Sequence, residues 1–105
     1  MARSAAIEEV VRRRCEHLER FASDIMSCRV VVDQLQQHQS QGRPFGVRID
    51  LTLAGLELAV DRVEDEDVHV ALRGAFDAMG RRIEDAVRRR RGDEKKHLST
   101  LPSVA

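Results

Sequence analysis

Arginines at regular spacing are the residues of this sequence whose chemistry is most distinctive. In the C-terminal third of the chain, Arg81 and Arg88 lie seven positions apart. Arg82 and Arg89 repeat this spacing one position further along. Seven residues are close to two turns of an α-helix, so each pair falls on one strip of a helical surface. Because a guanidinium group binds phosphate oxygens through two hydrogen bonds, such strips can follow a nucleic-acid backbone.

A second basic group lies near the N-terminus. On a helix, Arg13 and Arg20 share the outer face with acids, and Arg14 falls at the edge of the apolar stripe beside Phe21. The candidate RNA-binding residues are Arg13, Arg14, His17, Arg20, Arg81, Arg82, Arg88 and Arg89. The alternative is that these charges only solvate helix faces, since Asp77, Glu84 and Asp85 lie near enough in sequence to pair with the arginines.

The overall charge does not decide between these readings. Lysine plus arginine and aspartate plus glutamate number 18 each, so the formal net charge is zero. The distribution is uneven, with six acids and one arginine in residues 57–67, and eight bases and four acids in residues 81–96. A neutral protein can still concentrate positive potential on one surface. With three Phe and no Trp or Tyr, base stacking on aromatic side chains is not expected.

Other kinds of chemistry find little support. The sequence has no nucleophile elbow, zinc-protease motif or phosphate-binding loop. Its four His residues are scattered, and the acids of residues 64–67 are consecutive, so their side chains diverge. We therefore predict no catalytic residues, no metal site, no cofactor and no enzyme activity.

The two cysteines and the apolar segments indicate a reduced, soluble protein. Cys15 and Cys28 are thirteen residues apart and form no C-x-x-C pair, so we expect packed, reduced thiols. The sequence MARSAAIEE lacks the apolar region of a signal peptide, and no 18-residue apolar run is present. These features predict a cytoplasmic protein with no membrane partner.

The hydrophobic pattern predicts the elements in the first part of the chain. Residues 4–22 have apolar side chains at helical spacing, with Ser4 as a candidate N-cap. Residues 26–33 alternate as a strand. Residues 45–60 form the clearest hairpin signal, because apolar parity is preserved across a two-residue loop at Ala54-Gly55. A small bulge is expected near Gly55.

A second helix is expected to begin at Asp65 or Asp67 and to run to about Arg91, with Gly92 at the C′ position. The resulting order is helix, strand, hairpin, helix. Strands with one apolar face and helices with one apolar stripe predict an α+β fold, in which two helices cover one face of an antiparallel three-stranded sheet. We expect one domain over residues 4–92 and a disordered tail over residues 93–105.

Four segments together resemble one protein family. They are L-E-R-F at residues 18–21 with S-C-R-V-V-V at 27–32, V-R-I-D-L-T-L-A-G-L-E-L-A-V-D-R at 47–62, E-D-E-D-V-H-V-A-L-R-G-A-F-D-A-M at 64–79, and R-R-G-D-E-K-K-H at 90–97. In this order and spacing they are similar to the ribosome hibernation-promoting factors and ribosome-associated inhibitors, also called sigma modulation proteins. The similarity covers roughly residues 7–97.

The resemblance implies a β-α-β-β-β-α fold, like that of double-stranded RNA-binding domains. It also implies binding to rRNA of the small ribosomal subunit where tRNA and mRNA pass, so that translation stops in stressed or stationary cells. The family's basic positions fall here on Arg14, His17, Arg20, Arg81 and Arg82. His17 stands where many members carry Lys, and elsewhere Ala78 replaces a common base and His69 a common Tyr. Each departure is expected to weaken or reshape the contact.

The largest departure from the family is at the start of the chain. Family members have a strand of about ten residues before the first helix, whereas only Met1-Ala2-Arg3 stand there in this sequence. The strand at residues 26–33 is then expected to have an open edge. Three explanations are open: a misassigned start, pairing of this edge with another chain, or a marginal remnant of the family fold. Longer members also have a C-terminal dimerisation domain, for which these 105 residues leave no segment.

The functional prediction is a ribosome-associated translation inhibitor, or hibernation factor, that binds small-subunit rRNA without catalysis. Two alternatives are a general RNA-binding domain and a protein-interaction module that forms a homodimer through the exposed strand edge.

Overall fold

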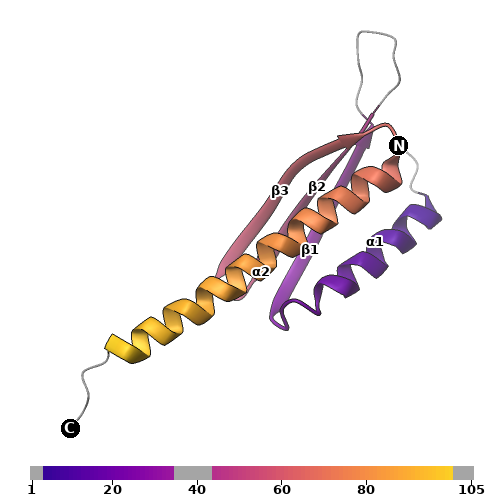
Figure 1. Ribbon diagram of the computed structural model, residues 1–105. Helices are drawn as coiled ribbons and strands as arrows, with labels where there is room; N and C mark the ends of the chain where they lie inside the picture. The colour runs from indigo at the N-terminus through magenta and orange to yellow at the C-terminus, as the bar shows by residue number, and fades with distance from the viewer. Residues whose placement is uncertain (1–3, 35–43, 101–105) are drawn as a thin grey trace.

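The protein has two helices and one sheet, seen here in a computed structural model that describes residues 4–34 and 44–100, with side chains as far as residue 92. The elements in chain order are α1 (Ala5–Leu18), β1 (Ile25–Gln34), β2 (Phe45–Leu53), β3 (Leu56–Asp65) and α2 (Val68–Thr100). The strands form an antiparallel sheet in the order β1-β2-β3. Both helices cover the same face of this sheet (Figure 1). The predicted α+β fold class is confirmed.

Helix α1 begins where the sequence predicts and ends earlier. The Oγ atom of Ser4 accepts a hydrogen bond from the backbone N–H of Ile7 at 3.4 Å, which confirms Ser4 as the N-cap. The helix ends at Leu18 rather than near Ala22. The next three residues donate to carbonyls three positions back, as when Phe21 donates to Leu18 at 3.0 Å. The last turn is therefore tightened, which carries the chain toward β1.

The hairpin has the predicted loop, and its bulge lies elsewhere. Leu53 pairs with Leu56, so the loop is Ala54-Gly55 alone, and Gly55 adopts a φ of 75°. Glycine tolerates this conformation because it has no Cβ atom. The bulge expected near Gly55 was a wrong prediction. The register shifts instead opposite Arg48, where β3 contains one extra residue.

Strand β1 alternates as predicted. Cys28, Val30 and Val32 are half-buried on the helix side, and the residues between them are exposed. On its inner side β1 pairs with β2, for example Val30 with Ile49. Within residues 4–34 and 44–100, no strand pairs with its outer side, so β1 is an edge of the described sheet.

The hydrophobic core lies between α2 and the sheet. Helix α2 packs on β2 and β3, and α1 lies beside it with β1 beneath. The largest fully buried side chains are Leu18, Ile49, Leu51, Leu53, Leu72, Met79, Ile83 and Val47. They are aliphatic or Met, as the scarcity of aromatic residues requires. Alternation on β2 and helical spacing on α2 bring these side chains onto facing surfaces.

The C-terminal end of α2 differs from the prediction. The helix was expected to end near Arg91, but its backbone continues through Gly92 to Thr100. Gly92 does not adopt a positive φ and so does not form the expected C′ cap. An interior glycine costs a helix only about 1 kcal/mol, and the neighbouring arginines favour helix. At about 1.5 Å per residue, the 33 residues of α2 make a helix longer than the strands. Its C-terminal end therefore projects beyond the sheet (Figure 1).

Replacing Leu51 by Ala should lower the free energy of unfolding by roughly 2–5 kcal/mol, because it leaves a cavity under α2. The side chain of Leu51 is 1% exposed. Leu56 on the neighbouring strand β3 is 38% exposed, so Leu56→Ala is a matched control. Urea unfolding of both variants measures the difference. Equal losses from Leu51→Ala and Leu56→Ala would contradict this description of the core.

Candidate nucleic-acid interface

The two helices present a groove that joins basic residues from both. Helices α1 and α2 lie side by side and run in the same direction (Figure 1). A groove of about 210 Å³ between them is lined by Arg14 and His17 of α1 and by Arg81 of α2. Three of the candidate residues predicted from separate segments are therefore brought together. Asp77 and Glu84 line the same groove, so its charge is mixed.

Phe21 packs against α2 at the floor of this groove. An added Cβ atom on Gly80 would lie 3.4 Å from the Phe21 ring, at ordinary van der Waals distance. The ring of His17 contacts Phe21 edge-on, with ring centroids 5.9 Å apart and an interplanar angle of 85°. This contact places His17 over the junction between the helices.

A second groove lies on the other side of α2. It has a volume of about 750 Å³ and runs between α2 and the hairpin loop, with Leu56 on the hairpin side. Arg82 and Arg89 line it together, as their shared strip predicts. Arg81 lines both grooves, because it lies on the outer face between them. Arg88 is exposed and lines neither groove.

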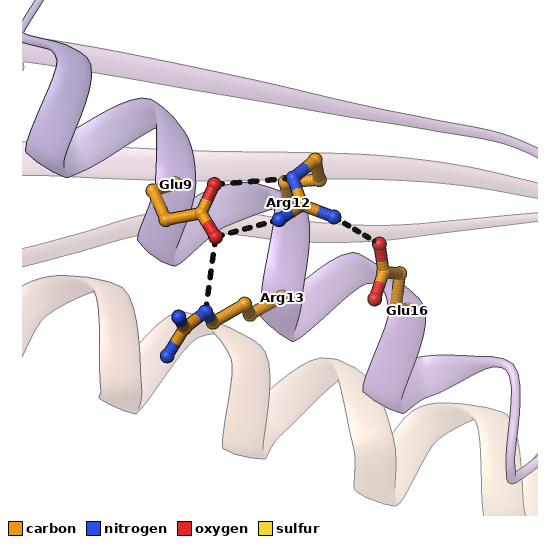
Figure 2. A network of polar contacts seen from close by, with 4 residues as sticks. All are labelled: Glu9, Arg12, Arg13 and Glu16. Atoms are coloured by element: carbon orange, nitrogen blue, oxygen red, sulfur yellow. Dashed lines mark hydrogen bonds and ion pairs between the residues drawn. The ribbon is translucent and has the colours of Figure 1, made fainter.

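The outer face of α1 is largely neutralised by its own acids. Figure 2 shows Arg12 between two glutamates, with its Nη1 atom 2.6 Å from Glu16 and contacts to both carboxylate oxygens of Glu9. Arg13 contacts the same Glu9 at 3.1 Å. The hydrogen bonds from Arg12 and Arg13 lower the pKa of Glu9, so the acid stays ionised. Arg13 is thus placed in an ion pair, and Arg20 is exposed and lines neither basic groove.

The arginines of α2 are different. Within the described parts of the chain, no carboxylate lies within 4.0 Å of the guanidinium groups of Arg81, Arg82, Arg88 or Arg89. The neighbouring acids Asp77, Glu84 and Asp85 therefore do not pair with them. These four side chains present charge to whatever approaches the helix.

Arg90 is a residue of this region to which the sequence reasoning gave no role. Its Nη1 atom donates to Asp24 at 2.7 Å, in the turn before β1, while its Nη2 atom is buried without a hydrogen bond among the described residues. The hydrogen bond from Arg90 lowers the pKa of Asp24. A signal was present in the sequence, because Arg90 lies seven residues after Ile83 and so continues the buried strip of α2 toward the sheet side.

Among the described side chains, His, Cys, Asp and Glu nowhere gather in groups of three or more that could hold a metal ion. In the same part of the chain, no helix is both long enough and apolar enough to cross a membrane.

The fold and this surface define a class: a small α+β domain that displays cations on two adjacent helices over one face of a sheet. The profile of one family matches residues 1–91, and that family is described as sigma 54 modulation protein / S30EA ribosomal protein. The chain belongs to this family of ribosome-associated factors, as its sequence resemblance indicated. A search of curated proteins found no match.

The ion pair between Asp24 and Arg90 predicts a pH dependence of stability. Because the pKa of Asp24 is lowered in the folded state, the pair contributes above the ordinary pKa of about 4 and is lost as pH falls through the lowered value. Asp24→Asn should lower the melting temperature at pH 7, and this loss should become smaller at pH 2 as the carboxylate of the unmodified protein is protonated. Thermal unfolding across this range tests the sign, with Asp33→Asn, at an exposed carboxylate, as the control. A loss of the same size at both pH values would refute it.

Proposed function

We propose that this protein is a translation inhibitor of the hibernation-factor type that binds rRNA of the small ribosomal subunit in the cytoplasm, without catalysis. The observation that carries the proposal is the set of four α2 arginines without a carboxylate partner among the described residues. Membership of a family of ribosome-associated factors supports the choice of partner. Occupation of the channel for tRNA and mRNA would block translation by exclusion alone.

The spacing of these arginines suits an RNA backbone. Arg81 and Arg88 are separated by seven residues, or about 10 Å along the helix axis. Arg82 and Arg89 form a parallel row, and the groove residues Arg14 and His17 extend the basic surface onto α1. Such contacts position a protein on folded RNA through phosphates rather than through base edges. Affinity then comes mainly from counterion release and falls as salt rises.

The zero net charge does not weaken this proposal, because the four consecutive acids of residues 64–67 lie far from Arg88 and Arg89. The acidic residues 64–67 precede α2, whereas Arg88 and Arg89 lie some twenty residues further along it. At about 1.5 Å per residue this separation is about 30 Å. Exposed charges are largely screened beyond about 8 Å at physiological salt. An RNA at Arg88 and Arg89 therefore experiences little repulsion from residues 64–67. Asp77, Glu84 and Asp85 lie closer and reduce the positive potential of the two grooves.

The double substitution Arg81→Ala/Arg88→Ala should reduce co-sedimentation with vacant small subunits. Loss of two phosphate contacts should also lower the slope of log affinity against log salt by about 1.5–2. The matched control is Arg12→Ala/Arg48→Ala, which removes the same charge from arginines that are already paired with acids. The control should bind almost as the unmodified protein does.

Undiminished binding by the Arg81/Arg88 variant, with its fold intact by circular dichroism, would remove the basis of the proposed mechanism. Competition with bulk RNA separates ribosome binding from general RNA binding. If bulk RNA displaces the protein as well as vacant subunits do, the general RNA-binding alternative is correct.

A second candidate is self-association through the open edge of β1. Val31 is 37% exposed on this strand, between Arg29 and Asp33. Antiparallel pairing of two copies about Val31 would place each Arg29 opposite the Asp33 of the other copy, which favours this register. Helix α1 lies along the same edge (Figure 1). The α1 helices of the two copies would therefore also meet across the dimer interface.

Sedimentation equilibrium without RNA tests this candidate. A dimer that is lost when Val31 is replaced by Lys supports it, because two lysines would then face each other across the pair. A monomer at all concentrations rules it out and leaves the RNA proposal unaffected.

A further inference from the structure

Cys15 on α1 and Cys28 on β1 bring two thiols together where the helix faces the sheet. Their Sγ atoms lie 3.4 Å apart, and both side chains are half-buried. A disulfide requires Sγ atoms about 2.05 Å apart, so closure needs an approach of roughly 1.3 Å. The sequence spacing gave no redox motif, and the pair arises because the fold places α1 over β1.

The layer between α1 and β1 is not fully packed on the N-terminal side of Cys15 along α1. A groove of about 980 Å³ separates α1 from the outer part of β1, with Ile7 and Val11 on the helix side and Val30 and Val32 on the strand side. These side chains are only partly buried, in contrast to those under α2. A small shift of α1 toward the sheet therefore meets no fully packed layer.

The two thiols are not equivalent. The hydrogen bond with Cys28 lowers the pKa of Cys15, against the opposing effects of burial and of Glu16 and Glu19. The same hydrogen bond, together with burial, raises the pKa of Cys28. The thiolate is the nucleophile in thiol–disulfide exchange, so the lowered pKa favours Cys15 as the attacking thiol.

We propose that Cys15 and Cys28 form an oxidisable dithiol that closes into an intramolecular disulfide when it meets a small-molecule disulfide. The Cys15 thiolate attacks one sulfur of the oxidant, forming a mixed disulfide and releasing one reduced thiol. Cys28 then loses its proton, attacks Cys15 Sγ and releases the second reduced thiol. The protein loses two protons and two electrons, which the oxidant gains, and α1 becomes covalently joined to β1.

The test is to incubate the purified full chain with oxidised glutathione and to measure its intact mass and free thiols. Closure lowers the mass by about 2 Da, removes both free thiols and is reversed by dithiothreitol. The melting temperature of the oxidised form should exceed that of the reduced form, because the cross-link restricts the unfolded chain.

A matched control moves one thiol to the other face of the sheet. The variant Ser27→Cys/Cys28→Ser keeps two cysteines, but position 27 is exposed and faces away from α1. It should form glutathione adducts or linked dimers rather than the closed form, while melting cooperatively when reduced. The proposal is overturned if the unmodified chain gives only adducts or dimers, or if the control closes as readily.

Discussion

The structure depends on the burial of one continuous apolar strip of α2 against β2 and β3. Leu51 and Ile49 project from the strand at every second residue, and Met79 and Ile83 project from the helix at every fourth. The two periodicities match only if α2 crosses the sheet on the face that also receives α1. At roughly 25 cal/mol for each Å² of apolar surface, this contact is the main source of stability in a chain with so few aromatic residues. The positions of all the arginines on α2 follow from it.

The periodic parts of the structure could be predicted from the sequence, and its interruptions could not. Alternation over residues 45–60 was enough to establish the hairpin and its register, because a slip of one residue would expose the apolar face. The end of α2 was wrongly predicted, since Gly92 is a stop signal only if it adopts a positive φ. The bulge opposite Arg48 was also missed at its true position. No local pattern in residues 61–63 distinguishes a bulged strand from a regular one.

The candidate site shows the same division. Helical spacing correctly put Arg82 and Arg89 on one strip, and the structure places both in the groove beside the hairpin. Spacing within one helix could not show that Arg14 and His17 of α1 line one groove with Arg81 of α2, because that depends on how the two helices pack. Nor could it show which arginines are neutralised. Arg13 forms an ion pair with Glu9, whereas Arg81 has no ion pair among the described residues although Asp77 and Glu84 line the same groove. This difference lies in side-chain geometry.

The projection of α2 beyond the sheet has a mechanical consequence. Arg88 and Arg89 lie where α2 passes the end of the hairpin. Here the hydrogen bond between Arg90 and Asp24 ties α2 to the turn before β1. Helical turns without a core beneath them can open at a lower free energy than the whole domain. The turns of α2 that project beyond the sheet are therefore expected to open at a lower free energy than the turns packed on β2 and β3. Arg88 and Arg89 lie near the boundary between these two parts of the helix, so bound RNA would contact the helix where its support by the sheet ends.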